Sequence, residues 1–219
     1  MFANPEQGAA VERLPGPSRF GRVLACAAVL SLCAAQQSDP LASRSKGSPE
    51  APITVYEMAD FQCPACRSFA LQTMPILERE YVQTGKVRLV FVHMPLTQIH
   101  PNAVAAAEVA SCAGRQNRFW TMHDALFLRQ SVWAPLPEPG PYLLALADSA
   151  GIDRRALTTC VTTNATRAEI EGDARRAARS GARSTPTFYI EGGLLAGAWP
   201  LSVYRRVLDS IYQIKTGGR

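Results

Sequence analysis

Long apolar stretches are missing from the 219-residue sequence, and cysteine, histidine and lysine are scarce. The most apolar segment, Val23–Ala35, has 13 residues, whereas a transmembrane helix needs about 20. A protein with several membrane spans is therefore excluded. Six cysteines are too few for a small disulfide-dense scaffold. The chain has 219 residues, of which 47% are hydrophobic. It is therefore long and apolar enough to fold around its own core, as one or two domains.

The charge is only moderately basic, at +5, and it is spread along the chain. The densest basic stretch, 175–183, directly follows Glu169, Glu171 and Asp173. Acidic residues ahead of basic ones on one helix suit the helix dipole and form i,i+4 pairs. We interpret this stretch as a solvated helix face, and we expect no nucleic-acid partner.

Residues 1–35 have the three parts of a secretory signal. A flank that contains arginine precedes the short apolar segment, which ends in Cys33-Ala34-Ala35 before Gln36. This order is typical of a signal peptide. A lipoprotein signal with Cys33 as the lipidated residue, an uncleaved anchor and a buried core helix are the alternatives. We predict a signal peptide or N-terminal anchor over 1–35, and export to the periplasm or cell envelope.

Residues 36–50 are rich in Ser, Pro, Gln and Ala, and this composition predicts a flexible linker. The folded domain is then expected over 51–216. Loss of the signal would remove Cys26 and Cys33 and leave four cysteines. Four is an even number, which is compatible with two disulfides in an oxidising compartment.

Beyond residue 50, strand-like and helix-like patterns follow one another in a simple order. Strands are expected over 53–58, 87–93 and 187–191, and Gly192-Gly193 predicts a tight turn into a last strand over 194–198. Helices are expected over 63–84, where Pro75 should kink or break the run, and over 101–114, 117–130, 141–150, 153–162, 164–181 and 201–215. The order predicts a small mixed α/β sheet (core 51–97 and 182–216) with a helical insertion over 98–181.

The motif Cys63-Pro64-Ala65-Cys66 lies where the first strand gives way to the first helix. A thiol at a helix N-terminus faces unpaired N–H groups and the positive end of the helix dipole, which favours the thiolate. We therefore predict that Cys63 is the attacking sulfur. Cys66 lies about one turn further in, where it can close a ring with Cys63 or resolve a mixed disulfide.

Zinc binding and an inert loop disulfide are the alternatives for this pair. A structural zinc site needs a second close pair of Cys or His, but Cys112 and Cys160 stand alone and the three histidines are scattered. The pattern therefore favours a redox dithiol, with no metal and no other cofactor.

Three stretches of the sequence carry a family resemblance: Asp60–Cys66 (DFQCPAC), Phe119–Phe127 (FWTMHDALF) and Ser184–Ile190 (STPTFYI). In this order they resemble the DsbA-like branch of the thioredoxin superfamily, over residues 47–215. The resemblance implies an α/β, thioredoxin-like fold with an inserted all-helical subdomain. It also implies a protein thiol:disulfide oxidoreductase whose redox disulfide is Cys63–Cys66.

The resemblance assigns roles to three further residues. Pro186 matches a cis-proline that faces the dithiol and turns the backbone of Thr185 toward Cys63. Glu57, on the strand that leads into the site, matches a buried acid that moves a proton to or from Cys66; a surface glutamate is the alternative. Ordinary trans-proline is the alternative at Pro186.

Two positions depart from the strongest oxidases of the family. The best-known member has His where this chain has Ala65, and a histidinium there stabilises the reduced form. Strong oxidases also carry Val where this chain has Thr185. Both departures predict a milder oxidant, and a reductase or an isomerase therefore remains an alternative function.

The resemblance also implies a second, structural disulfide between Cys112 and Cys160, in two helices of the insertion. Two free buried thiols are the alternative.

The expected function is therefore an exported thiol–disulfide oxidoreductase, acting as an oxidase on cysteine-containing exported proteins. A membrane partner, a DsbB-like or VKOR-like quinone reductase, would re-oxidise it. A reductase, an isomerase or a chaperone-like binder of the same fold is the alternative, and a zinc-dependent interaction module is a third hypothesis.

Overall fold

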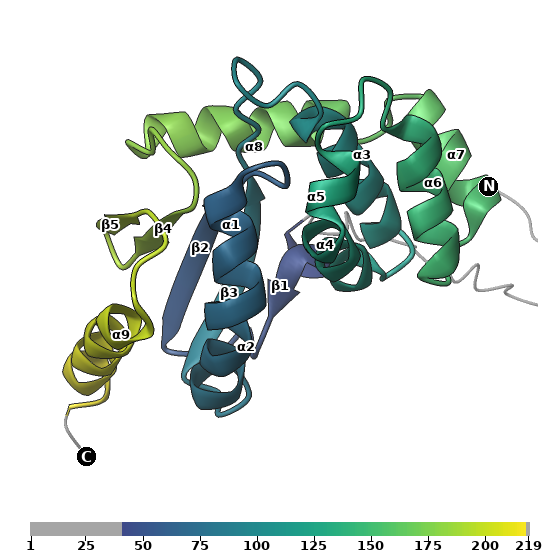
Figure 1. The fold of residues 1–219 in the computed structure, drawn as a ribbon. Helices are drawn as coiled ribbons and strands as arrows, with labels where there is room; N and C mark the ends of the chain where they lie inside the picture. The colour runs from purple at the N-terminus through teal and green to yellow at the C-terminus, as the bar shows by residue number, and fades with distance from the viewer. Residues whose placement is uncertain (1–40, 218–219) are drawn as a thin grey trace, which may run out of the picture. The chain divides into compact units, whose positions relative to one another are not determined.

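The fold is described from a computed structural model, for residues 41–217. Within that range the strands form one sheet in the order β1-β3-β2-β4-β5 (Figure 1). The strands are β1 (Ser45–Lys46), β2 (Ile53–Ala59), β3 (Val87–His93), β4 (Thr187–Ile190) and β5 (Gly193–Ala196). Strands β2 and β3 are parallel, and the other neighbouring pairs are antiparallel. The predicted strands over 53–58 and 87–93 are present, since their β-branched runs are buried in the centre of the sheet.

The hairpin turn between β4 and β5 lies one residue earlier than predicted. Ile190 pairs with Gly193, so that the turn is Glu191-Gly192. Both of these residues have positive φ, 47° and 90°, as a type I′ turn requires. The glycine pair suggested the turn, but the pairing of the strands places Gly193 in β5.

The helical segment that follows β2 continues beyond Pro75. It consists of α1 (Pro64–Ser68), a π-helical turn η2 (Phe69–Thr73), α2 (Met74–Leu77) and a second π-helical turn η3 (Glu78–Val82). Pro75 stands in the first turn of α2, directly after η2. A proline inside a regular helix lacks a donor and clashes with the carbonyl four residues earlier. The wider turn before Pro75 accommodates it, and the helix continues instead of breaking.

The insertion between β3 and β4 is helical, as predicted. Its helices are α3 (Ala103–Gly114), α4 (Phe119–Leu128), α5 (Gln130–Trp133), α6 (Gly140–Ser149), α7 (Arg154–Thr162) and α8 (Arg167–Arg179), and the chain ends in α9 (Leu201–Thr216). The single helix predicted over 117–130 is two helices, since the backbone of Arg129 (φ −99°, ψ 11°) is not helical. None of the helices within residues 41–217 is both long and apolar enough to cross a bilayer.

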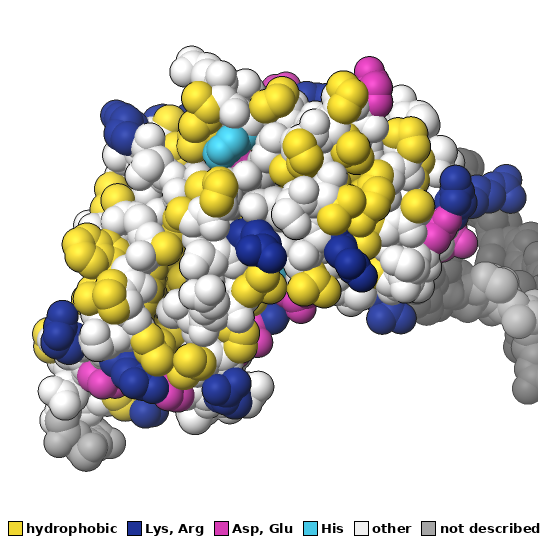
Figure 2. All heavy atoms as spheres, viewed as in Figure 1, with side chains coloured by type: hydrophobic (Ala, Val, Ile, Leu, Met, Phe, Trp, Pro, Cys, Tyr) yellow, Lys and Arg dark blue, Asp and Glu magenta, His cyan; other side chains and the backbone are white. Residues whose placement is uncertain are grey.

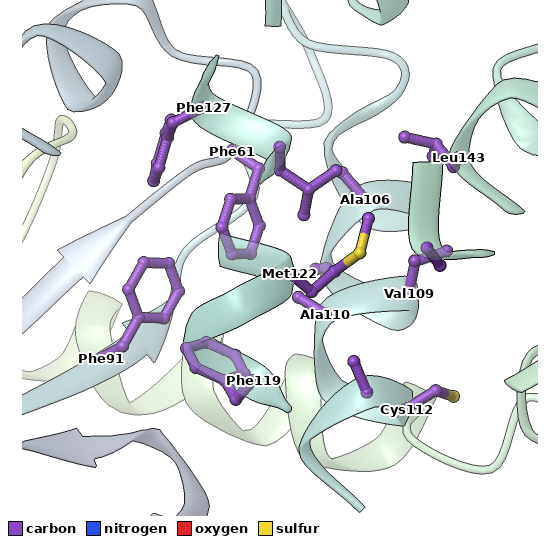
Figure 3. Close-up of a cluster of buried hydrophobic side chains, with 14 of the residues drawn as sticks. Phe61, Phe91, Ala106, Val109, Ala110, Cys112, Phe119, Met122, Phe127 and Leu143 are labelled. Carbon is purple, nitrogen blue, oxygen red and sulfur yellow. The ribbon is translucent and has the colours of Figure 1, made fainter. Parts of the chain in front are cut away.

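A buried aromatic cluster joins the insertion to the sheet (Figure 3). Phe61 follows β2, and its ring centroid lies 5.0 Å from that of Phe91 on β3 and 5.1 Å from that of Phe127 on α4. Phe119 and Met122 of α4 complete the contact, and both are buried. The cluster also includes Cys63 and Cys66, so the reactive segment is packed directly against the insertion.

The two faces of the sheet are covered by different helices. The α1–α2 run and α9 pack on the face that carries Val55 and Phe188, and α8 packs on the opposite face, against Met58 and Val92. On the face of the molecule shown in Figure 2, Lys and Arg side chains are spread among hydrophobic and neutral ones, and some of them lie beside Asp or Glu.

The flexible linker predicted over 36–50 is wrong at residues 42–46. Residues 42–46 form the 3-10 turn η1 (Ala42–Arg44) and strand β1, which pairs with β3. Arg44 is 1% exposed, forms an ion pair with Asp173 of α8, and lies 2.9 Å from Glu169. A short edge strand and a buried ion pair leave no apolar signature, so composition alone misses them. The rest of that linker up to residue 40, and the predicted signal over 1–35, lie outside the described residues.

Asp173 also differs from its predicted place on a solvated face. It is fully buried and accepts a hydrogen bond from the backbone N–H of His93 at 3.1 Å. It binds Arg176 as well as Arg44. Burial of a carboxylate is costly unless it is paired and hydrogen-bonded, and here Asp173 has both kinds of partner.

Cys112 of α3 and Cys160 of α7 form a disulfide, with Cα atoms 5.8 Å apart. The bond ties two helices of the insertion across a sequence separation of 48 residues.

The double variant Cys112→Ala/Cys160→Ala should unfold more readily than the wild type. A loop of this length restricts the unfolded chain by about 4 kcal/mol in the chain-entropy account. Urea denaturation of both proteins, each with Cys63–Cys66 oxidised, measures the difference. An unchanged free energy of unfolding would mean that the disulfide is not a stabilising element.

Candidate active site

Cys63 is the N-cap residue of α1, and Pro64 is its first helical residue. The structure shows Cys63 and Cys66 as free thiols, 7% and 0% exposed. The backbone of Cys63 is extended (φ −72°, ψ 123°), and the helix begins directly after it. The Cys63 carbonyl accepts the N–H of Arg67 at 3.1 Å. The sequence motif therefore lies, as its residues require, across the start of a helix.

The segment before β4 faces this helix N-terminus. The Thr185–Pro186 peptide bond is cis, and the Thr185 carbonyl accepts a hydrogen bond from Cys63 Sγ at 3.3 Å. The Pro186 carbonyl in turn accepts the N–H of Gly197 at 2.7 Å. The structure thus brings Thr185 and Pro186, about 120 residues away in sequence, against the reactive thiol.

The pKa of Cys63 is lowered from 9.0 to about 5. A hydrogen bond from the Cys66 thiol contributes most, and burial opposes it. The Thr185 side chain also lowers the pKa, and the N–H groups of Cys66 and Ala65 add to the effect. Donors aimed at a thiolate stabilise it relative to the thiol.

The pKa of Cys66 is shifted the opposite way, well above 9.0. Burial is the main cause, and its role as donor to Cys63, together with the charge of Cys63, adds to the shift. At neutral pH one sulfur is therefore charged and nucleophilic, and the other remains a protonated donor. This asymmetry is what a dithiol needs for ordered disulfide exchange.

Glu57 is fully buried on β2, beside Phe91 of β3 and Phe188 of β4. Neither carboxyl oxygen has a hydrogen-bond partner among the described residues. Burial raises its pKa to about 8; the charge of Lys46 lowers it, and that of Glu78 raises it. The charge of Glu57 in turn contributes to the raised pKa of Cys66, so the structure places the acid near the second thiol and away from the surface.

A group of polar side chains that the sequence did not single out fixes the loop before Cys63. Asp60 is 1% exposed and accepts three hydrogen bonds, from the N–H groups of Gln62 and Leu96 and from Nδ1 of His100, at 2.7–2.8 Å. The amide of Gln130 reaches the same loop from α5. The sequence assigned no role to Asp60 or Gln130, because most of their partners lie in distant segments of the chain.

The remaining histidines do not gather at the site. His93 bonds Ser111 at 2.8 Å and His123 bonds Asp124 at 2.8 Å, and both are buried. Within residues 41–217, no cluster of three or more His, Cys, Asp or Glu side chains is arranged to hold a metal ion.

Titration of the reduced protein should show Cys63 losing its proton near pH 5. Cys66→Ala removes the strongest donor, and the midpoint should rise toward the ordinary thiol value. The matched variant Cys63→Ala, which keeps Cys66, should show no thiolate below about pH 9. Ultraviolet thiolate absorbance and the pH dependence of alkylation both report the midpoint. An unchanged midpoint in Cys66→Ala would contradict this assignment of the donor.

Comparison with known proteins gives a consistent family. The family model described as Thioredoxin matches residues 41–210. Among curated proteins, the chain is 27% identical over 153 residues to "Probable disulfide bond formation protein D" of Bacillus cereus, covering 69% of this chain and 71% of that protein. It is 36% identical over 154 residues to "Na(+)/H(+) antiporter NhaA 3" of Salinispora tropica, covering 70% of this chain and 22% of that protein. The chain thus spans about a quarter of the length of the antiporters that it matches.

Among solved structures, the fold matches alpha-DsbA1 of Wolbachia pipientis with a TM-score of 0.71 at 23% identity, over 79% of this chain and 92% of that one. The predicted fold class, a thioredoxin-like fold with a helical insertion, is confirmed. The fold is thus like that of a DsbA protein, and since the family model covers most of the chain, the chain belongs to the thioredoxin family.

Proposed function

We propose that the protein is a thiol–disulfide oxidoreductase that exchanges disulfides with other proteins through Cys63 and Cys66. The observation that carries the proposal is the placement of the two thiols: Cys63 is the N-cap residue of α1 and contacts the Thr185 carbonyl, whereas Cys66 lies inside α1 and is fully buried. In agreement with this placement, the pKa of Cys63 is lowered to about 5 and that of Cys66 is raised. A sulfur that is a good leaving group and a buried sulfur that returns to the thiol are the two halves of a reversible exchange.

The chemistry starts from the Cys63–Cys66 disulfide. A substrate thiolate attacks Cys63 Sγ, which forms a mixed disulfide and releases Cys66 as a thiolate that takes up a proton. A second substrate thiolate then attacks the substrate sulfur of the mixed disulfide and releases Cys63 as a thiolate. The substrate gains a disulfide, and two electrons remain on the Cys63–Cys66 pair.

Oxidation of substrates is the direction that we favour. Every donor that stabilises the Cys63 thiolate stabilises the reduced form, and a stable reduced form makes the disulfide a stronger oxidant. Ala65 supplies no histidinium, so the donors are Cys66, Thr185 and the helix N–H groups. Disulfide reduction or isomerisation by the same site, or chaperone-like binding, is the alternative.

Glu57 is proposed to exchange a proton with Cys66. The Cys66 thiolate released in the first step needs a proton in a site that excludes water, because Cys66 is 0% exposed. A carboxyl with a pKa of about 8 holds a proton at neutral pH and can give it to a thiolate of higher pKa.

Substrates and partners follow from the proposed chemistry and compartment. The relative in Bacillus cereus is named for disulfide bond formation, which supports the proposed activity. We propose cysteine-containing exported proteins as substrates, in the periplasm or cell envelope, and a quinone-linked membrane protein as the partner that re-oxidises the dithiol.

Equilibration with glutathione buffers tests the direction of electron flow. We expect a reduction potential well above that of thioredoxin, about −270 mV, and oxidation of a reduced unfolded protein by the disulfide form. Cys63→Ser should abolish this oxidation, and Cys66→Ser should trap a mixed disulfide. A potential near that of thioredoxin would favour the reductase, and full activity of Cys63→Ser would refute redox chemistry altogether.

Burial of Glu57 also predicts a pH-dependent stability. Because its folded pKa lies near 8, above the unfolded value near 4.5, its contribution is complete below pH 4.5 and is lost as the pH rises toward 8. The loss amounts to at most about 4–5 kcal/mol. Glu57→Gln should remove this part of the pH dependence.

Denaturation of the oxidised protein, in which the two thiols do not titrate, isolates the contribution of Glu57. Glu50→Gln, the same change at an exposed position, is the matched control and should follow the wild type. Parallel stability curves for Glu57→Gln and the wild type from pH 4.5 to 8 would show that Glu57 titrates normally.

A further inference from the structure

Gln130 connects the helical insertion to the reactive segment. It is the first residue of α5 and is 5% exposed. Its side-chain amide Nε2 donates to the Phe61 carbonyl at 2.7 Å and to the Cys63 carbonyl at 2.9 Å. One neutral amide therefore uses both of its N–H groups on the backbone of the loop that presents the nucleophile.

The Cys63 carbonyl is held from two sides. The N–H of Arg67, in the same helix, donates to it at 3.1 Å, and Gln130 donates from the insertion. Rotation of this peptide group would turn the Cys63 backbone, and with it the direction of Sγ. That direction keeps the sulfur against Thr185 and the N–H groups at the start of α1.

We propose that Gln130 is a positioning residue for the nucleophile: its amide fixes the Cys63 peptide so that Sγ meets the donors that stabilise its charge. This inference rests on the proposed exchange reaction, and it adds a residue from the insertion to the machinery. The insertion then sets the reactivity of Cys63 as well as covering the site.

A merely structural role for Gln130, as a tie between insertion and core, makes a different prediction. Asn102 provides the comparison. It is 8% exposed, and its side-chain Nδ2 donates to the carbonyls of Ala134 and Leu136, at 3.1 and 2.7 Å. These are also two amide-to-carbonyl bonds, to the segment that directly follows α5, but they do not involve the Phe61 or Cys63 carbonyl.

The test compares Gln130→Met with Asn102→Ala. Methionine has the length of glutamine but no donor, and Asn102→Ala keeps the backbone N–H that binds Gln62. We expect Gln130→Met to raise the pKa of Cys63 by about one unit, so that alkylation of Cys63 at pH 5 slows about fivefold. The reduction potential should fall with it. Asn102→Ala should lower the unfolding temperature and leave both quantities at their wild-type values.

Gln130→Asn provides a second variant that keeps a polar group against the carbonyls. Its side chain is one methylene too short to span both bonds, so the pKa of Cys63 should shift in the same direction. Wild-type pKa and potential in both Gln130 variants, or an equal shift in Asn102→Ala, would overturn the positioning role. The proposed function fails separately, if the wild type itself does not exchange disulfides.

Discussion

The reactivity of the site depends on the stabilisation of one buried negative charge, on Cys63 Sγ at the start of α1. A thiolate that is only 7% exposed has lost most of its hydration, and burial alone would raise its pKa. The pKa of Cys63 is lowered instead, because groups at the start of α1 and Thr185, in the loop before β4, stabilise the charged sulfur.

The helical insertion packs against the loop that carries Cys63. Phe61 stands two residues before Cys63, and its ring lies among those of Phe91, Phe119 and Phe127. The apolar contact locks α4 to the end of β2 (Figure 3). Since protein interiors are close-packed, a shift of α4 would move the loop that presents Cys63. Polar contacts from Asp60 and Gln130 then fix the backbone of that loop.

Burial also controls the ionisation of Glu57 and Cys66, the second half of the site. Glu57 and Cys66 both lie in surroundings that disfavour charge, and the pKa of each is raised, mainly by desolvation. On the other face of the sheet, Asp173 remains paired with Arg44 and Arg176. Among the described residues, Asp60 and Asp173 are thus buried acids with partners, whereas the carboxyl oxygens of Glu57 have no hydrogen-bond partner. An unpaired buried acid is the kind of group whose proton is available for chemistry.

Much of this could be predicted from the sequence, because the relevant signals are local. The β-branched runs of β2 and β3 have the composition of buried strands, the alanine-rich stretch is helical by periodicity, and Cys63-Pro64-Ala65-Cys66 marks the start of a helix by its own chemistry. Pro75 shows the limit of such rules: the residue forbids a regular helix, but the neighbouring turn could widen.

What only the tertiary structure decided is which distant groups meet. The order of residues determined the strands, the helices and the position of the dithiol. It did not determine that Gln130 binds the Cys63 carbonyl, that Asp173 binds Arg44, or that residues 42–46 join the sheet. Hydrogen bonds and ion pairs between remote segments leave no periodicity, since each depends on the packing that brings its two partners together.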